Sequence, residues 1–343
     1  MAYHTGRHGP TPARPTLATH RTTDTIMSPR PPADDQRPAE TTIATGDQWV
    51  IGHGHQRAVI TAVGATLRSF TVEDRPVIDG FGPDEWSHGG RGQVLAPWPN
   101  RLGDGRYTFQ DTEAQAALDE PSRGNAIHGL VRWRPWQMAG RAQNQISMVC
   151  ELHPQPAYPF ALRLTVEYRL GRDGLIVVTE AENIGDVDLP FGLGFHPYLL
   201  VGTHSVDQVR LTVPAERRLI TDDRGLPTTV APVDGTEFDF LSGRLIGVTR
   251  LDTGFTGLRR DADGRARVEL DHPDGTGGAT VWADERFGYF MVYTGDTLEP
   301  GAQRRALAVE PMTCPPDALR SGTDLTVLRP GSRWTGSWGI SPR

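Results

Sequence analysis

Three titratable side chains in this sequence stand where the neighbouring residues favour a fixed position. His196 and His128 each lie in a segment rich in glycine, proline and aromatic residues, and Glu310 follows the apolar run 306–309. Histidine is the side chain whose ordinary pKa lies closest to neutrality. A carboxylate at the end of an apolar strand is partly desolvated, which raises its pKa toward neutrality. Each of the three is therefore a candidate general acid or base.

Ordinary structural roles would produce the same local patterns. A buried histidine with both ring nitrogens satisfied, or a histidine in a turn, is common in folded proteins. Glu310 would equally well form a salt bridge with one of the many arginines. The segments taken singly leave both interpretations open.

Polar and aromatic residues in the same segments favour a binding cleft. Arg101 follows a Trp-Pro pair and Asn100, which suits a hydrogen-bond donor held in a cleft, whereas Asp252 is either a second polar contact or a turn residue. Sugar rings have apolar C–H faces and polar rims, so aromatic faces beside a few polar donors favour a carbohydrate site, although core packing would explain any single aromatic residue. The aromatic residues in these segments are Trp98, Trp133, Trp136, Tyr198 and Tyr293.

Two histidines and a glutamate are also a possible set of zinc ligands. His128, His196 and Glu310 are separated by 68 and 114 residues, a spacing that neither supports nor excludes a metal. The sequence contains no His-Glu-x-x-His and no Cys-x-x-Cys motif. We therefore predict no metal site.

Residue usage argues against several other chemistries. The chain contains no lysine, so its 35 basic residues are all arginine. This excludes a Schiff-base lysine, a pyridoxal phosphate anchor and a P-loop lysine. The Gly-x-Ser-x-Gly motif of serine hydrolases is absent, and the glycines at 192 and 194 do not extend to a dinucleotide-binding motif. We expect no cofactor.

Charge and hydropathy limit the partners and the compartment. The formal net charge of −7 argues against a general nucleic-acid binder. No apolar run is long enough to span a membrane, and the N-terminus lacks the apolar core of a signal peptide. Two cysteines, Cys150 and Cys314, do not form a disulfide framework in a chain of 343 residues. We expect a cytoplasmic protein whose partner is a small molecule, with no membrane and no nucleic acid involved.

The elements that must position these residues are predicted to be strands. Residues 162–170 alternate apolar and polar side chains, a turn follows at 171–174, and residues 175–183 read as a second strand, so together they predict a hairpin. Residues 59–70 read as two short strands broken at Gly64, and further strands are expected at 290–293 and 306–309. No amphipathic helix of 12 or more residues is evident. Strands at short spacing joined by turns favour an all-β antiparallel sandwich or barrel.

The chain divides by composition near residue 40. Residues 1–40 are rich in Pro, Arg, Thr and His and have almost no aliphatic run, so we predict a disordered N-terminal tail. Met27 lies inside this stretch, and translation starting there would remove most of it. Nothing resembling a linker interrupts residues 41–343, and we expect them to form one large β domain.

Five segments in a fixed order make the chain similar to the aldose 1-epimerase (mutarotase) family. The likeness covers residues 41–343. No single motif is decisive, but the five together in order are specific, and the motifs around His128 and Glu310 resemble a bacterial branch of the family. The segments are Pro99-Asn100-Arg101 with Gly105-Arg106-Tyr107, Asn125-Ala126-Ile127-His128-Gly129, Gly194-Phe195-His196-Pro197-Tyr198, Leu251-Asp252, and Tyr293-Thr294-Gly295-Asp296 with Val309-Glu310-Pro311.

The resemblance implies a fold and an activity. The family fold is a large antiparallel β-sandwich, the galactose mutarotase-like supersandwich, which agrees with the strand pattern. The implied reaction interconverts the α and β anomers of an aldose by opening and closing the sugar ring. Glu310 would be the catalytic base and His196 the catalytic acid. The implied substrate-binding residues are Arg101, His128, Asp252, Asn100, Trp133 and Tyr198.

The sequence leaves the substrate and two rival functions open. A neutral hexose fits the resemblance, and Arg132 and Arg134 would suit a phosphorylated or sulfonated sugar unless they are solvated loop residues. A glycoside hydrolase or lyase would need two carboxylates, for which Glu310 and Asp252 are candidates. A sugar sensor would need the cleft but not the acid–base pair. Oligomeric state is not indicated by the sequence.

Overall fold

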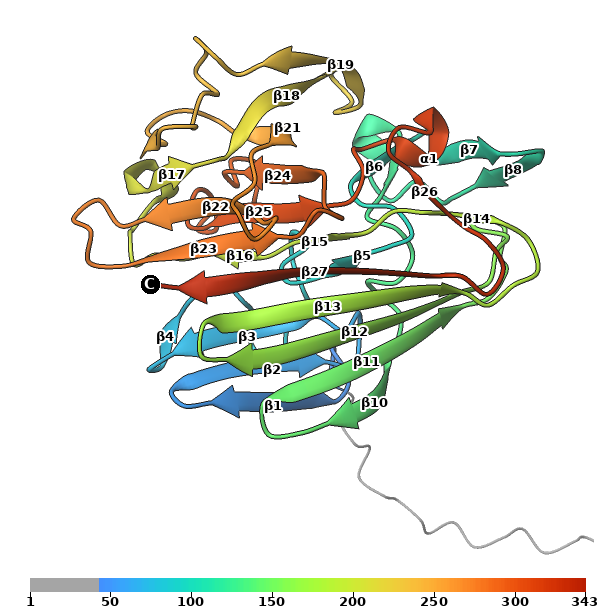
Figure 1. Cartoon of the computed structure of the whole chain (residues 1–343), viewed down its shortest axis with the longest axis horizontal. Helices are drawn as coiled ribbons and strands as arrows, with labels where there is room; N and C mark the ends of the chain where they lie inside the picture. Colours follow the sequence, from blue (N-terminus) through green and yellow to red (C-terminus); the bar gives the residue numbers. More distant parts are fainter. Residues whose placement is uncertain (1–42) are drawn as a thin grey trace, which may run out of the picture. The chain divides into compact units, whose positions relative to one another are not determined.

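A computed structural model describes residues 43–343 of the chain, and the regular elements among them are almost all antiparallel strands (Figure 1). The expected tail at 1–40 lies outside the described residues. The one α-helix within 43–343 is a single turn, α1 (Ala318–Ser321), accompanied by 3-10 turns at Pro121–Arg123 and Val206–Gln208. No described helix has the length and hydropathy that crossing a membrane would require.

Two large sheets form the body of this unit. The first has nine strands in the order β10 (Gln137–Arg141), β11 (Gln145–Leu152), β12 (Leu162–Gly171), β13 (Gly174–Asn183), β27 (Arg333–Pro342), β23 (Gly278–Ala283), β22 (Ala266–Asp271), β17 (Arg210–Thr212) and β20 (Arg244–Leu245). The second has the order β19 (Pro227–Pro232), β18 (Ala215–Thr221), β21 (Asp252–Leu258), β24 (Tyr289–Tyr293), β25 (Leu307–Met312), β15 (Gly194–Phe195) and β5 (Val94–Leu95), and β16 (Tyr198–Leu199) also pairs with β25. Their strands pair antiparallel, as expected for the family fold.

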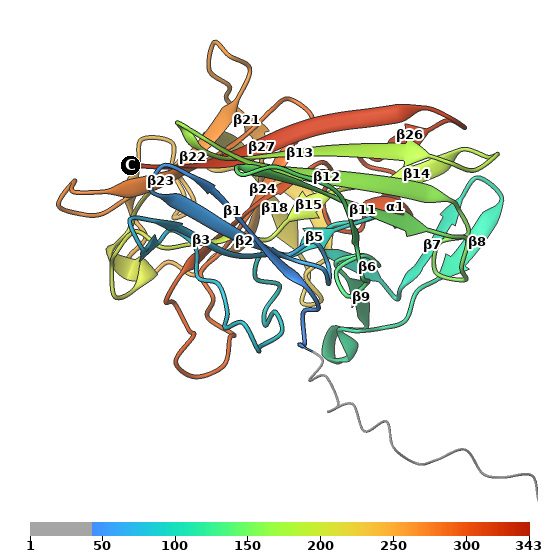
Figure 2. The same cartoon turned by 90° about the horizontal axis from the view of Figure 1, so that it is seen from below.

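Smaller sheets complete the described part of the chain. A four-stranded sheet lies against β11 and β12 (Figures 1 and 2). It contains β1 (Gln48–His53), β2 (Gln56–Thr61), β3 (Leu67–Val72) and β4 (Arg75–Pro76). Three strand pairs are β6 (Arg101–Gly103) with β9 (Asn125–Ile127), β7 (Arg106–Phe109) with β8 (Thr112–Gln115), and β14 (Leu189–Phe191) with β26 (Thr326–Leu328).

The strand predictions are confirmed at the positions that were read most directly from periodicity. The hairpin at 162–183 is present as β12 and β13, whose register pairs Leu162 with Asn183 and Gly171 with Gly174. The two strands broken at Gly64 are β2 and β3. The strand before Glu310 was predicted too short, because β25 continues through Pro311 to Met312.

The alternation of side chains along the strands explains how one core serves both sheets. The inward residues of β12, from Leu162 to Leu170, are fully buried and belong to the main hydrophobic cluster. Inward residues of the second sheet, including Val292 and Val309, belong to the same cluster. Burying a leucine- or valine-sized side chain contributes about 1.5–3 kcal/mol. The second sheet therefore has one face committed to the core, and its opposite face is left for other contacts.

Candidate active site

A cleft of about 480 Å³ lies on the second sheet and the loops that follow β5 and β9. All eight residues expected to act on the substrate line it: Asn100, Arg101, His128, Trp133, His196, Tyr198, Asp252 and Glu310. They come from segments separated by as many as 210 residues of sequence. The fold therefore brings the predicted residues together in one place.

Glu310 lies in the middle of β25, on the face turned away from the main core. Its neighbours at 307 and 309 belong to the main core, whereas Ala308 and Met312 on the Glu310 face belong to separate small clusters. Only 2% of the residue is exposed. Burial raises the pKa of the Glu310 carboxyl well above its usual range, Asp252 raises it further, and Arg101 opposes the shift. Glu310 is therefore more deeply desolvated than its expected place at a strand end implied.

His196 faces Glu310 from the short connection between β15 and β16. Its Nε2 lies 3.3 Å from Glu310 Oε1. Burial lowers the pKa of His196 to about 3, and the charges of Arg91 and Arg132 also lower it. Both shifts therefore favour the uncharged forms, the carboxylic acid of Glu310 and the neutral imidazole of His196.

The pair retains unused hydrogen-bonding capacity. Glu310 Oε2 and His196 Nδ1 are buried and have no partner among the described residues. A buried polar atom without a partner costs about 1–3 kcal/mol. Such atoms inside a cleft point to a polar ligand that completes them.

His128 and Arg101 are brought side by side by the pairing of β6 with β9. Arg101 pairs with Ile127, and the backbone N–H of His128 donates to the carbonyl oxygen of Asn100 at 2.8 Å. Asn100 and His128 both have positive φ angles, +55° and +65°, a conformation that non-glycine residues adopt infrequently. The ring centroids of His128 and His196 are 5.3 Å apart, and the two ring planes make an angle of 75°. Burial lowers the pKa of His128.

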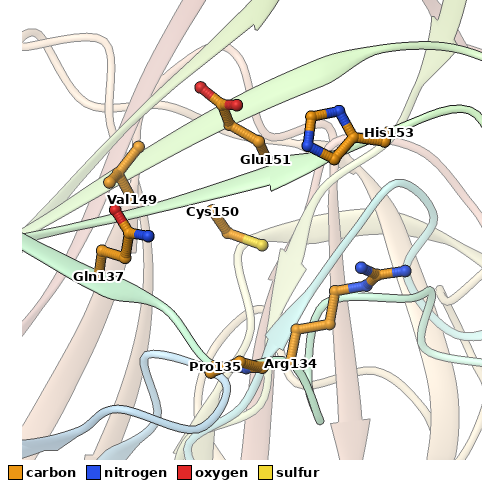
Figure 3. A pocket seen from close by; sticks show the side chains of 7 residues that line it. All are labelled: Arg134, Pro135, Gln137, Val149, Cys150, Glu151 and His153. Carbon is orange, nitrogen blue, oxygen red and sulfur yellow. The ribbon is translucent and has the colours of Figure 1, made fainter.

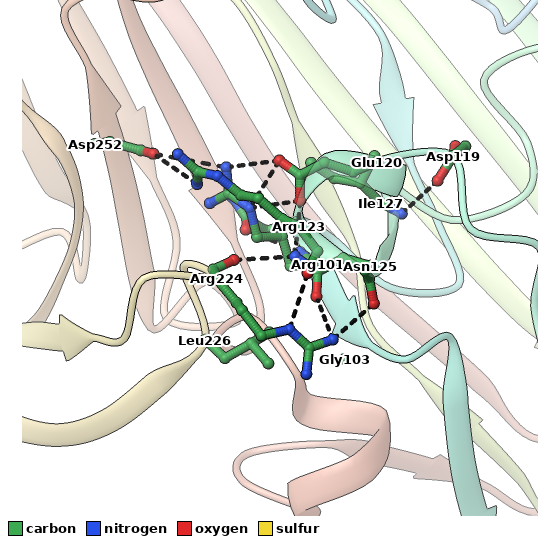
Figure 4. A network of polar contacts seen from close by, with 12 residues as sticks. Arg101, Gly103, Asp119, Glu120, Arg123, Asn125, Ile127, Arg224, Leu226 and Asp252 are labelled. Atoms are coloured by element: carbon green, nitrogen blue, oxygen red, sulfur yellow. Dashed lines mark hydrogen bonds and ion pairs between the residues drawn. The ribbon is translucent and has the colours of Figure 1, made fainter.

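Arg101 is held by a network of polar contacts (Figure 4). Its Nε and Nη2 donate to the Glu120 carboxylate at 3.0–3.2 Å, and Nη2 lies 3.6 Å from the Asp252 carboxylate. Asn125 donates to Glu120 as well, and Arg224 binds the carbonyl oxygen of Gly124. The guanidinium is only 10% exposed, so it presents a fixed donor to the cleft.

The aromatic residues divide between the cleft and the core. Trp133 lines the cleft with half of its surface exposed, and Tyr198 and Tyr293 line it as well. The expectation that Trp98 and Trp136 belong to the carbohydrate site is wrong, since both are buried in the main core. Proximity in sequence to the site segments does not decide whether a side chain faces the cleft or the core.

Arg132 and Arg134, the two arginines that would suit an anionic sugar, line different cavities. Arg132 lines the cleft, where it pairs with Asp119 at 2.6 Å. Arg134 instead lines a second cavity of about 310 Å³ beside Cys150 and His153 (Figure 3). Arg134 therefore contributes nothing to the candidate active site.

The described residues offer little support for metal or thiol chemistry. Within 43–343 no group of three or more His, Cys, Asp or Glu side chains has the geometry of a metal site. Cys150 and Cys314 are both free and buried, and burial raises their pKa values to about 11 and about 12. Neither thiol is prepared to act as a nucleophile.

Sequence reasoning missed several residues that line the cleft, notably Ser87, Gly89, Gly90, Glu120 and Arg123. Glu120 precedes a Pro-Ser-Arg turn and reads locally as an exposed loop residue. Gly90 lies so close to His196 that a Cβ atom there would sit 2.6 Å from the imidazole Cδ2. The Gly-Gly pair at 89–90 was the available signal, because adjacent glycines mark a close approach of the backbone as well as a turn.

Comparisons with known proteins identify the family of the chain. A family model described as Aldose 1-epimerase matches residues 47–341. The Escherichia coli protein named Uncharacterized protein YihR is 35% identical over 288 residues, which cover 84% of this chain and 90% of that protein. The family match lies within the described residues 43–343.

Solved structures are similar in fold. A GalM/aldose epimerase homologue from C. elegans superposes with a TM-score of 0.77 at 19% identity, covering 87% of this chain and 98% of the other. A galactose 1-epimerase from Lactobacillus acidophilus gives a TM-score of 0.72 at 18% identity, with coverages of 85% and 92%. At these identities the likeness concerns the fold alone.

Proposed function

Because the chain belongs to the aldose 1-epimerase family, we propose that its cleft interconverts the α and β anomers of an aldose. The observation that carries the proposal is the buried pair of Glu310 and His196, whose facing atoms are 3.3 Å apart. A carboxyl and an imidazole at that distance can each give or take a proton. Anomer exchange requires such a pair, because the proton transfers in ring closing reverse those in ring opening.

Ring opening moves one proton off the sugar and one onto it. Glu310 as carboxylate takes the proton of the C1 hydroxyl while protonated His196 gives its proton to the ring oxygen. The C1–O5 bond breaks and a C1 aldehyde forms. Rotation about C1–C2 exposes the other face of the aldehyde, and ring closing returns both protons. The C1–O1 bond becomes the double bond of the aldehyde as the C1–O5 bond breaks, so C1 keeps its oxidation level and the reaction needs no electron donor or acceptor.

The pair of Glu310 and His196 can share the proton that the reaction requires. Burial favours Glu310 as the carboxylic acid and His196 as the neutral imidazole. Transfer of the proton from Glu310 to His196 produces the base and the acid together, with no change in net charge. Sugar hydroxyls hydrogen-bonded to Glu310 and the nearby charge of Arg101 would both favour the carboxylate.

The remaining residues of the cleft are proposed to hold the sugar. Arg101, Asn100 and Asp252 offer fixed donors and acceptors for hydroxyl groups, and His128 lies close enough to His196 to contact an oxygen near C1. Trp133 offers an exposed aromatic face for the C–H side of the ring. Fixed orientation contributes a large part of the rate in reactions of this kind.

Polarimetry tests the proposal directly. Freshly dissolved α-D-glucose, α-D-galactose and a hexose 6-phosphate are followed to equilibrium with the wild type, with Glu310→Gln, with His196→Asn and with buffer alone. We expect the wild type to accelerate relaxation of at least one sugar and both variants to lose that acceleration. Normal rates in Glu310→Gln would overturn the assignment of the base.

Two rival functions predict results that other assays detect. A glycoside hydrolase would release reducing sugar from a disaccharide or aryl glycoside, which an epimerase does not do. A sugar sensor would bind a sugar, as calorimetry detects, without accelerating anomer exchange. Either result in the absence of mutarotation would replace the proposed function.

A further inference from the structure

His196 is one layer of a stack that continues behind the cleft. Its imidazole lies nearly parallel to the ring of Tyr198, with 4.9 Å between centroids and 13° between planes. The guanidinium carbon of Arg91 lies 5.0 Å from the centroid of the same Tyr198 ring. Tyr198 therefore contacts both groups through its ring, and it is itself fixed by a 2.9 Å hydrogen bond from its hydroxyl to Gly89.

Arg91 is buried and held in place. Its side chain is 4% exposed, its Nε donates to Asp79 at 3.1 Å, and its Nη1 donates to the carbonyl oxygen of His88 at 2.8 Å. Asp79 is also bound by Arg305, whose Nη2 lies 2.8 and 2.9 Å from the two carboxylate oxygens. Asp79 thus pairs with two cations, which leaves positive charge in excess on this side of Tyr198.

We propose that Arg91 is a positioning residue for the reaction: through Tyr198 it fixes the ring of His196, and its charge keeps the His196–Glu310 pair from taking up a second proton. The proposal rests on the proposed function. Arg91 does not line the cleft, so it acts through the stack and not through contact with the sugar.

The groups that face His196 explain why such a cation is useful. Glu310 faces His196 from β25. His128 and Arg132 lie in the segment that follows β9 and line the same cleft. Tyr198 stacks on the imidazole of His196, and Arg91 lies over the ring of Tyr198. A pair that held two protons would have no base to receive the C1 hydroxyl proton. Burial and the two arginines all lower the pKa of His196, so they all oppose that doubly protonated state.

Two substitutions separate the charge of Arg91 from its shape. Arg91→Gln removes the charge, while Asp79 keeps its paired contacts with Arg305. Arg91→Lys keeps the charge on a different side chain. Arg260→Gln is the control, since Arg260 is a partly buried arginine that binds only backbone carbonyl oxygens at 2.8–3.4 Å and does not line the cleft.

The first readout does not depend on activity. The ring proton signals of His196 are identified by their loss in His196→Asn and are titrated by NMR from pH 7 down to the lowest pH at which the protein stays folded. Loss of one nearby charge in a buried site is expected to raise the pKa of His196 by about one unit, a tenfold change in protonation. We expect this rise in Arg91→Gln and its absence in Arg91→Lys and Arg260→Gln.

The second readout is the pH profile of kcat/KM for anomer exchange. In Arg91→Gln the acid limb should move up by about one pH unit, because the pair takes up its second proton at higher pH. An unchanged His196 titration in Arg91→Gln, or an equal change in Arg91→Lys, would overturn the inference. If the wild type accelerates no aldose, the proposed function fails while the titration still decides the role of Arg91.

Discussion

At the scale of single residues, the cleft places an ionisable pair where ionisation is unfavourable. Glu310 and His196 are 2% and 5% exposed, and burial shifts their pKa values in opposite directions, up for Glu310 and down for His196. Both shifts oppose charge in the folded state. Such a pair is expected to reduce stability while it makes proton exchange between the two groups easy.

Replacing Glu310 by glutamine is expected to stabilise the protein near neutral pH while it abolishes turnover. Above about pH 4.5, the usual pKa of a glutamate, the unfolded chain releases the Glu310 proton, whereas the folded chain retains it because its pKa is raised. Stability therefore falls as pH rises through this range, and the amide of the variant does not titrate. We expect a Tm higher by about 2 °C or more at pH 7 and no gain below pH 4.

Thermal unfolding at pH 4, 5.5 and 7 measures this effect. Glu216→Gln serves as the control, since Glu216 is exposed on β18 and pairs with Arg259. A variant of Glu310 that is less stable than the wild type at pH 7 would mean that the carboxylate is ionised and stabilising in the folded state.

A second residue-scale prediction concerns Glu120, which holds the guanidinium of Arg101. Glu120→Gln removes the charge from a contact of three hydrogen bonds at 3.0–3.2 Å. Losing a charge-assisted hydrogen bond costs about 1.5–3 kcal/mol. We expect KM to rise about tenfold with a smaller change in kcat, because Arg101 is proposed to hold the sugar and not to transfer the proton.

Initial-rate kinetics over a range of sugar concentrations tests the role of Glu120. Glu151→Gln is a suitable comparison, as Glu151 pairs with Arg163 on the exposed side of β11. A large loss of kcat at unchanged KM would assign Glu120 to the chemical step instead of to binding.

At the scale of elements, strand register decides which side chains meet. Pairing of β24 with β25 sets Met291 opposite Glu310, and pairing of β21 with β24 sets Asp252 opposite Tyr293. These residues share the face of the second sheet that does not form the main core. A shift of one residue in β25 would turn Glu310 into the core, so the register itself determines the site.

The loop at residues 88–92 packs against His196. Gly90 has a φ of +81°, and a Cβ atom there would meet the His196 ring at 2.6 Å. Gly90→Ala is expected to lower kcat by about tenfold or more by displacing the imidazole, with a modest loss of stability. Gly235→Ala is a matched control, because Gly235 also has a positive φ, +70°, but no atom within 4 Å of the added Cβ.

Comparing the two glycine variants separates backbone strain from the clash. Both should show a similar fall in Tm, and only Gly90→Ala should lose anomer exchange. Full activity in Gly90→Ala would show that the loop is free to move away from His196.

At the scale of the whole molecule, the two large sheets share one core, and the second sheet carries the cleft on its other face. Strands of that sheet therefore contribute alternate residues to packing and to the site, as Val309 and Glu310 do. The cleft residues rest on a rigid support, which keeps the acid–base pair in a fixed geometry.

A chain that begins at residue 42 is expected to keep the rate and the Tm of the full chain. The family match begins at residue 47, and the buried core of the described residues begins with Ile51. Polarimetry and thermal unfolding of the two chains side by side make the comparison. A loss of activity in the shorter chain would assign residues 1–41 a role at the cleft.

Local pattern was sufficient for several strands, and the family resemblance was sufficient for eight of the residues that line the cleft. Alternation along 162–170 predicted β12 because one face of that strand is buried, and the segments around His196 and Glu310 carried the family resemblance. Periodicity and the order of motifs along the chain can both be read from the sequence without knowledge of the fold. The membership of Trp98 in the core was not visible in this way, since burial depends on the strands that pack from elsewhere.

Tertiary structure alone decided the distances and the environment of the site. The 3.3 Å contact of His196 with Glu310 joins residues 114 positions apart, and the stack of Arg91 on Tyr198 joins residues 107 apart. Glu120 is in an ordinary loop by sequence and becomes the partner of Arg101 only through the pairing of β6 with β9. The burial of a side chain, its hydrogen-bond partners and the charges near it come from residues that are distant in sequence. The pKa shifts of Glu310 and His196 therefore depend on the tertiary structure.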